Sequence, residues 1–294
     1  MERWKLMSYD HPRGRKGLLD EISIILREEC VISVIANPYM EAAQKFSTML
    51  SHIRDSSLIV RALRSSFFDC NSLFILFNAY NATVQFAEYV VKKLKSLGIG
   101  IIKTLVVDSA LSLSALLPLL SEELVLTPWS TLGTIDPYIF VSHVMPKEAM
   151  AVKESIDQAI ASVPKDGGGK GQVIYALAVS GSLYEYVLSE KHIRYLERLL
   201  NDYVRDRVAE PKFNELMNRM LNNIDVHDQP LSAKEINDLV NYSKIVEDRQ
   251  LLNMIERYYN SAINYLNKSG KALLIETSLV TYDITPPNTN PLGY

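Results

Sequence analysis

The sequence predicts an α/β fold with a parallel sheet, covered by helices on both faces, and a mostly helical second half. Runs of consecutive apolar residues typical of buried strands occur at Val31–Ala36, 73–77, 101–107 and 124–126. Segments with apolar residues at helical spacing lie between them, at 17–29, 41–53, 56–64 and 83–97. Continuous apolar strands alternating with amphipathic helices favour a parallel sheet, because such strands are buried on both faces.

Downstream of residue 145 the pattern is mainly helical. Expected helices span 146–162, 171–188, 191–208, 212–221 and 251–266. Ser232 and Glu235 have the spacing of a capping box that opens one more helix. A last strand is expected at 272–280, followed by a loose tail. We expect an α/β domain over residues 1–245, and a C-terminal helix, strand and tail over 246–294.

Composition narrows the function classes. At 294 residues with a net charge of −3, the chain is long enough for a sizeable core and has no electrostatic reason to bind nucleic acid. The longest apolar window, 111–126, is interrupted by Pro118 and by two glutamates, so no membrane span is expected. The first residues lack the apolar stretch of a secretory signal.

Two cysteines and one glycine run complete these expectations. Cys30 and Cys70 each lie beside an apolar run, and we expect them to be small buried hydrophobic residues in a reducing compartment. A cytoplasmic location follows from this and from the absence of a signal. The glycines of 165–171 follow a helix rather than a strand, which favours a flexible connector over a phosphate-binding loop. No histidine has metal-ligand spacing, so no metal or other cofactor is expected.

Three separate segments carry the residue types of an acyl-transfer triad. A serine cluster, Asp108-Ser-Ala-Leu-Ser-Leu-Ser114, precedes an apolar helix; Asp136 lies in a turn before a proline; and His227 lies far downstream. Triad geometry does not require sequence adjacency. Read alone, Ser112 is more often a helix cap, Asp136 a turn residue and His227 a surface histidine.

Taken in order, several segments resemble the archaeal serine dehydrogenase proteinase family of ClpP-like serine peptidases, which have the ClpP/crotonase fold. The segments that carry the resemblance are Ala110-Leu-Ser112, Glu122-Glu-Leu-Val-Leu-Thr-Pro128, Leu132-Gly-Thr-Ile-Asp-Pro137 and Val226-His-Asp-Gln-Pro-Leu231. The resemblance covers about residues 13–247. It implies a ClpP/crotonase-like parallel-sheet core, a peptide or protein substrate, no cofactor and a homo-oligomer.

The resemblance also implies roles for individual residues. Ser112 is the expected nucleophile, His227 the general base and Asp136 the carboxylate that orients the imidazole. Asp228 is an alternative carboxylate, and His143 an alternative base if the order of the triad is that of ClpP. Asn81, Ala82 and Leu113 occupy the positions of the oxyanion hole and of substrate binding.

At those positions the chain departs from the family. Asn81-Ala82 and Leu113-Ser114 each replace a Gly-Gly pair, and no N-terminal membrane anchor is expected. Losing one oxyanion donor costs about 2.7–4 kcal/mol of transition-state stabilisation. Two hypotheses follow: a serine peptidase-like hydrolase that acts through Ser112, or a catalytically degenerate relative that binds peptides or serves in an assembly. A crotonase-like acyl-CoA enzyme is a distant third, since no glutamate pair or basic adenine-phosphate pocket supports it.

Overall fold

A central β-sheet forms the core of the computed structural model, which describes residues 12–39, 49–67, 69–139, 147–163, 169–222 and 230–285. The main path of the sheet has the order β11-β10-β1-β2-β3-β4-β9. Off this path, the short strand β5 pairs with the last two residues of β3, and β8 pairs with β5. The strands are β1 Val31–Ala36, β2 Ser72–Ala79, β3 Ile101–Ala110, β4 Glu123–Leu126, β5 Thr131–Leu132, β8 Leu231–Ser232, β9 Ser243–Ile245, β10 Leu273–Glu276 and β11 Thr281–Ile284. A separate pair joins β6 Tyr138–Ile139 to β7 Lys147–Glu148.

The predicted parallel core is confirmed. Strands β1, β2, β3, β4 and β9 are parallel neighbours, whereas β10 and β11 add an antiparallel edge beside β1. Along β1, Ile32 and Val34 face one apolar layer, and Val31 and Ile35 face the other. Because side chains alternate between the two faces of a strand, consecutive apolar residues supply both layers.

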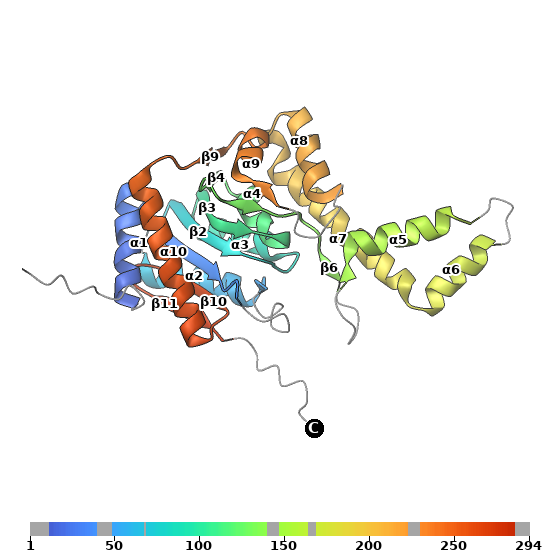
Figure 1. The fold of residues 1–294 in the computed structure, drawn as a ribbon, viewed down its shortest axis with the longest axis horizontal. Coiled ribbons are helices and arrows are strands. Elements are labelled where there is room, and N and C mark those ends of the chain that lie inside the picture. The colour runs from blue at the N-terminus through green and yellow to red at the C-terminus, as the bar shows by residue number, and fades with distance from the viewer. Residues whose placement is uncertain are drawn as a thin grey trace, which may run out of the picture.

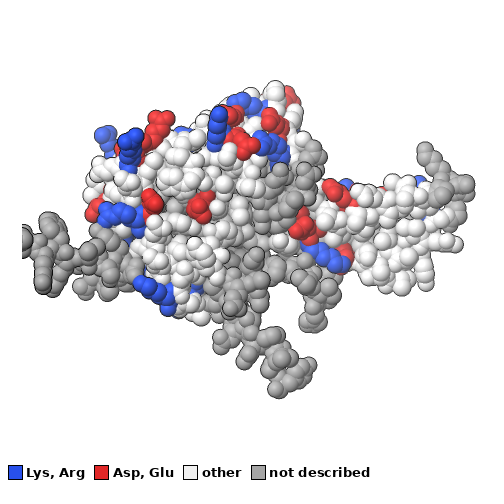
Figure 2. Space-filling model, in the orientation of Figure 1, with Lys and Arg blue, Asp and Glu red and all other residues white. Residues whose placement is uncertain are grey.

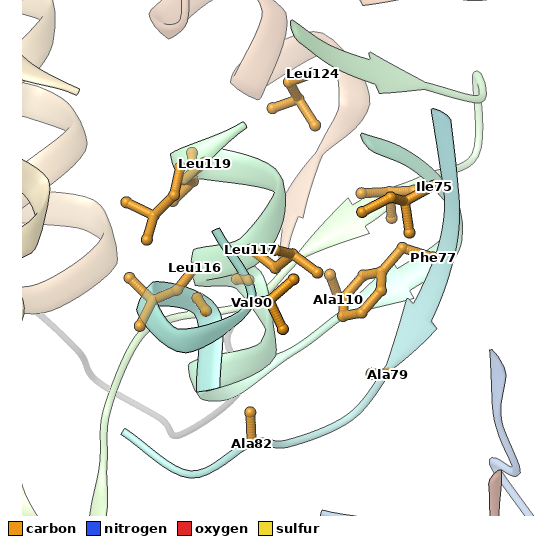
Figure 3. Packing of buried hydrophobic residues seen from close by; sticks show 14 of the residues in the cluster. Ile75, Phe77, Ala79, Ala82, Val90, Ala110, Leu116, Leu117, Leu119 and Leu124 are labelled. Carbon is orange, nitrogen blue, oxygen red and sulfur yellow. The ribbon is translucent and has the colours of Figure 1, made fainter. Parts of the chain in front are cut away.

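Helices cover both faces of the sheet (Figure 1). One face is covered by α1 Pro12–Leu26 and α10 Arg249–Ser269, whose apolar residues form one buried cluster. The other face is covered by α2 Arg54–Ser66, α3 Phe86–Ser96, α4 Leu116–Leu120 and α9 Ala233–Leu239. Figure 3 shows Leu117 and Val90 between the helices and Phe77 and Ala110 of the sheet. The fold is therefore a three-layer α/β structure, as predicted.

A helical arm projects from this body (Figure 1). It consists of α5 Ala149–Ala161, α6 Gly169–Val179 and the outer part of α7 Ser182–Tyr203, and α8 Glu210–Met217 follows with a π-helical turn, Asn218–Asn222. We expected a helix boundary between 188 and 191, but the chain breaks at Gly181, whose φ of +78° is accessible mainly to glycine. Within the described residues, no helix has both the length and the apolar character needed to cross a membrane.

Other expectations meet the structure in different ways. The helix expected at 41–53 falls mostly on residues outside the described ranges, and most of the glycine run lies outside them as well. The capping box is confirmed, because Ser232 and Glu235 bond reciprocally at the start of α9. Of the strand expected at 272–280, only β10 is extended; the chain then turns, and β11 pairs antiparallel with β10. Since β10 joins the sheet of the first domain, the two sides of residue 245 are in contact, and the domain division stays a prediction.

Cys30 is buried as expected, but the expectation that the two cysteines are not paired is wrong. Cys30 and Cys70 form a disulfide, with their Cα atoms 6.2 Å apart. Cys30 precedes β1 and Cys70 precedes the neighbouring parallel strand β2. Strand pairing therefore brings both residues to the amino ends of the strands, side by side. Forty residues separate them in sequence, which hides this proximity. The argument for a reducing compartment from cysteine usage is therefore lost.

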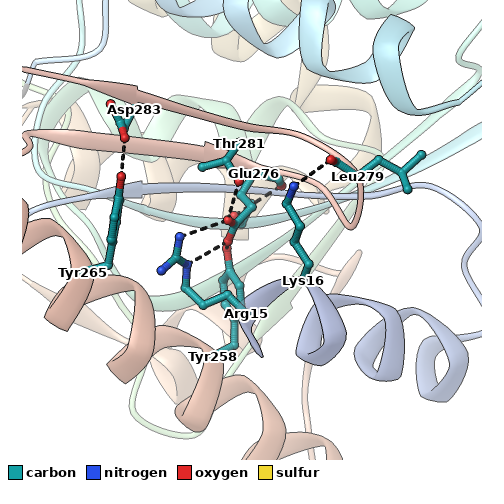
Figure 4. A network of polar contacts seen from close by, with 9 residues as sticks. Arg15, Lys16, Tyr258, Tyr265, Glu276, Leu279, Thr281 and Asp283 are labelled. Atoms are coloured by element: carbon teal, nitrogen blue, oxygen red, sulfur yellow. Dashed lines mark hydrogen bonds and ion pairs between the residues drawn. The ribbon is translucent and has the colours of Figure 1, made fainter. Parts of the chain in front are cut away.

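A buried ion pair attaches the C-terminal hairpin to the body (Figure 4). Arg15 of α1 donates from Nε and Nη2 to the two carboxylate oxygens of Glu276, at 3.1 and 3.2 Å, and both side chains are fully buried. The Tyr258 hydroxyl and the Thr281 hydroxyl also donate to this carboxylate, at 3.2 and 2.7 Å. The guanidinium carbon of Arg15 lies 4.2 Å from the centre of the Tyr265 ring. These contacts satisfy charges that would otherwise be costly to bury.

Arg15→Met is expected to destabilise the protein by about 3–5 kcal/mol, because it leaves the Glu276 carboxylate buried without its cation. Lys244→Met is the matched control, since Lys244 pairs with Glu123 at the surface and such pairs contribute about 0–1 kcal/mol. Urea denaturation of both variants measures the difference. Similar, small losses in both would show that the buried pair does not hold the hairpin.

Candidate functional site

Ser112 lies in a strained turn at the carboxyl end of β3. Its φ is +54°, in the left-handed region that non-glycine residues rarely adopt. The turn leads from β3 through Leu111 into a 3₁₀ helix, Ser112–Ala115, and then into α4. Such a conformation costs on the order of 1–2 kcal/mol and persists only where its surroundings enforce it. In parallel α/β sheets, ligand sites lie beyond the carboxyl ends of the strands, where this serine is located.

Neighbouring backbone atoms hold the turn in place. The Leu111 N–H donates to the Ala79 carbonyl at the end of β2, at 3.0 Å. The Ser114 hydroxyl donates to the same carbonyl at 2.8 Å. From the other side, the Gly133 N–H donates to the Ala110 carbonyl at 2.9 Å. A Cβ on Gly133 would lie 3.1 Å from the Leu111 Cα and 3.2 Å from the Ser112 N, so any larger residue would push this loop away from the turn by a few tenths of an ångström.

The loop after Gly133 brings Asp136 to Ser112. The Ser112 hydroxyl donates to the backbone carbonyl of Asp136 at 3.3 Å, and both residues are buried. The Asp136 carboxylate accepts a hydrogen bond from the Met150 N–H in the first turn of α5, at 3.1 Å. A carboxylate there accepts from an N–H that would otherwise be unpaired, and the positive end of the helix stabilises its negative charge. Two predicted triad residues are thus adjacent, in contact through a backbone carbonyl.

His227, its alternative His143 and the alternative carboxylate Asp228 lie outside the described residues. The complete triad therefore stays a prediction. Within the described ranges, no group of three or more His, Cys, Asp or Glu side chains has the arrangement to hold a metal ion.

The three predicted oxyanion-hole and substrate-binding residues do come together. Asn81, Ala82 and Leu113 line one cavity of about 190 Å³ next to the Ser112 turn. The Ala82 N–H, however, donates to the side-chain oxygen of Asn81 at 2.7 Å. One candidate oxyanion donor is therefore already engaged in this conformation. Asn81, which replaces a glycine of the family pattern, supplies the acceptor.

His192 is a further residue of this cavity that the sequence reasoning missed. It lies on α7 and lines the cavity with Tyr138 of β6. Its Nδ1 is buried and has no hydrogen-bond partner within the described part of the chain. Burial lowers the pKa of His192, because it disfavours the charged imidazolium. One sequence signal was present, since His192 lies three residues after Ser189 and four before Leu196, both on the buried stripe of α7.

No protein-family model matches the chain, and no curated protein matches its sequence. Among solved structures, the chain is similar to two variants of the 1510-N membrane-bound stomatin-specific protease. A lysine-to-alanine variant in complex with a substrate peptide is 12% identical, with a TM-score of 0.40 over 81% of this chain and 82% of that chain. A serine-to-alanine variant is 11% identical, with a TM-score of 0.39 over 81% and 86%. Similarity this low carries no inference about activity.

The strain at Ser112 makes a measurable prediction. Ser112→Gly is expected to be more stable than Ser112→Ala by about 1 kcal/mol, because both lose the hydroxyl but only glycine adopts a positive φ freely. At Ser114, whose φ is not positive, the order should reverse, with alanine more stable than glycine. Thermal or urea unfolding of the four variants provides the comparison. If alanine is at least as stable as glycine at position 112, the turn is not strained in solution.

Proposed function

We propose that this chain is a serine peptidase-like hydrolase of the ClpP/crotonase type that cleaves peptide bonds through an acyl-enzyme at Ser112. The observation that carries the proposal is the positive φ of Ser112 at the carboxyl end of β3. Strained residues of this kind cluster at active sites, and a serine on a strand-to-helix turn is a recurrent arrangement for nucleophiles. The cavity lined by Asn81, Ala82 and Leu113 supplies a place for substrate beside it.

The proposed reaction follows the chemistry of other serine hydrolases. The Ser112 oxygen attacks the peptide carbonyl carbon while His227 takes the hydroxyl proton, and Asp136 orients the imidazole. Collapse of the tetrahedral intermediate breaks the C–N bond, and His227 returns the proton to the leaving amine. Water then attacks the ester, and the same groups release the carboxylic acid and regenerate Ser112. Since Ser112 is fully buried in this structure, the covering residues must move for substrate to reach it.

A second candidate is a catalytically degenerate relative that binds peptides without cleaving them. The hydrogen bond from the Ala82 N–H to Asn81 favours it, because this N–H then no longer points to a substrate carbonyl. The complete burial of the Ser112 hydroxyl favours it as well. This candidate retains the cavity and the turn but loses the transition-state stabilisation that turnover requires.

Hydrolysis of casein and short fluorogenic peptides distinguishes the two candidates. The wild type is expected to cleave, and Ser112→Ala and His227→Ala should lower kcat by about 10⁴-fold or more, since each removes a group on which the others depend. Ser109→Ala is the control, because Ser109 lies on β3 near the turn and its hydroxyl bonds Thr131 and Asp108. Activity that survives in Ser112→Ala would refute the proposed nucleophile.

One further variant of the same assay tests the oxyanion position. Asn81→Gly removes the acceptor of the Ala82 N–H and should raise kcat, by up to about 10²-fold if that N–H then meets the substrate oxygen. Peptide binding without turnover, in both the wild type and Asn81→Gly, would favour the non-cleaving candidate.

We also propose that the chain self-associates through its helical arm. No residue of α6 is buried, although the helix is rich in apolar side chains. Tyr175 and Val179 are 72% and 70% exposed, and residues 171–184 contain no charged side chain. Figure 2 shows the outer part of the arm with few charges. A second copy of the chain is the proposed partner, since contact between two arms would remove both apolar surfaces from water. A cytoplasmic location remains a prediction.

Val179→Glu is expected to shift the protein to a smaller species in size-exclusion chromatography with light scattering, because it places a charge in the proposed contact. The matched control is Ile24→Glu, since Ile24 is 74% exposed but lies on α1 in the body. A wild type that is monomeric at high concentration would contradict the proposal, as would an equal effect of both variants.

A further inference from the structure

The Ala79 carbonyl oxygen, at the end of β2, accepts two hydrogen bonds from the chain around Ser112. The Leu111 N–H donates to it at 3.0 Å, and the Ser114 hydroxyl donates to it at 2.8 Å. One donor comes before Ser112 in the chain and the other comes after it. The same oxygen therefore fixes both ends of the short segment in which Ser112 has its positive φ.

The second of these bonds depends on a side chain rather than on the backbone. Ser114 is fully buried, and its hydroxyl also donates to the Leu111 carbonyl at 2.7 Å. Without this hydroxyl, each carbonyl keeps a backbone donor, which is the Leu111 N–H for Ala79 and the Ser114 N–H, at 3.3 Å, for Leu111. Removal of the hydroxyl therefore leaves both carbonyls with a partner, but it releases the later half of the turn from β2.

The strain at Ser112 gives a released turn a reason to move. The left-handed conformation is unfavourable for a residue with a Cβ, and it persists only while its surroundings enforce it. Without the Ser114 bond, the φ of Ser112 relaxes, and its side chain turns with it. The bond also sets the place of Ser112 relative to Asn81 and Ala82, because these residues follow Ala79 in the chain. Relaxation would thus displace the proposed nucleophile from the candidate oxyanion donors.

We infer that Ser114 is a positioning residue, whose hydroxyl holds Ser112 in the left-handed conformation and in a fixed place beside Asn81 and Ala82. The effect on catalysis rests on the proposed function, whereas the effect on the turn does not. Both hydrogen bonds that the Ser114 hydroxyl donates go to backbone carbonyls, so this hydroxyl holds the turn and is not itself a nucleophile.

A double-mutant cycle in thermal unfolding tests the effect on the turn without any need for activity. Ser114→Ala loses the same hydroxyl in either background, but relaxation of a strained φ compensates only where residue 112 is a serine. The loss in Tm is therefore expected to be smaller in the wild-type background than in Ser112→Gly, by about 2 °C for a chain of this length. Equal losses, or a larger loss in the wild-type background, would overturn the inference.

Ser121→Ala is the matched control for this cycle. Ser121 is also fully buried, lies at the other end of α4, and donates to the Leu117 carbonyl at 2.8 Å. Its replacement should lower Tm equally in both backgrounds, because its hydroxyl bonds Leu117 and Thr104 rather than the Ser112 turn. A dependence on the background as large as that of Ser114→Ala would also overturn the inference.

Peptide hydrolysis and labelling by a fluorophosphonate measure the catalytic consequence. Ser114→Ala is expected to lower kcat and the labelling rate by about 10- to 100-fold with KM little changed, because a small displacement of the nucleophile suffices. Ser114→Cys, which keeps the volume and a weaker donor, should retain part of the rate, and it replaces Ser114→Ala in both assays if that variant does not fold. Ser121→Ala should retain the full rate.

The outcomes separate the positioning role from the proposed function. A wild-type kcat in Ser114→Ala would refute the positioning role. A wild type that neither cleaves peptides nor is labelled would refute the peptidase, and the unfolding cycle would still decide whether Ser114 holds the turn.

Discussion

The left-handed turn at Ser112 is the constraint on which the candidate site depends. Three carbonyl groups fix it: Ala79 at the end of β2 accepts from Leu111 and Ser114, Ala110 accepts from Gly133, and Asp136 accepts from the Ser112 hydroxyl. Strand pairing positions the first two, and the close approach of Gly133 positions the third. The strain at one residue is thus supported by the ends of two parallel strands and by the loop that follows β5.

The body of the fold supplies the rigidity for this turn. Strands β2 and β3 lie in the middle of the sheet and are buried between the two apolar layers, so their carboxyl ends are fixed by packing on both faces. Asp136 links this region to the arm, because its carbonyl contacts Ser112 and its carboxylate caps α5. Helix α7 begins in the arm and runs back toward the body, and its residue His192 lines the cavity. The site is therefore assembled from the sheet and the arm together.

Local patterns predicted most of the sheet and its helices. Val31–Ala36 was correct to the residue, and the Ser232 capping box was confirmed, since both signals depend on neighbouring residues alone. The helix boundary at Gly181 was missed because apolar spacing continues across it while the positive φ leaves no mark other than the glycine itself. The disulfide was missed for a different reason, because the pairing of β1 with β2 creates the proximity of Cys30 and Cys70.

In the candidate site, too, local sequence patterns predicted some features, whereas tertiary contacts determine the others. Ser112, Asp136, Asn81, Ala82 and Leu113 were identified from ordered segments, and the structure places them around one turn and one cavity. The engaged Ala82 N–H and the unpartnered His192 Nδ1 depend on tertiary contacts that no spacing reveals.

The central claim is that Ser112 is an activated nucleophile. Intact-mass analysis after incubation with a fluorophosphonate tests it most directly: the account predicts one adduct, on Ser112, absent from Ser112→Ala, whereas well-folded wild type without an adduct would contradict it.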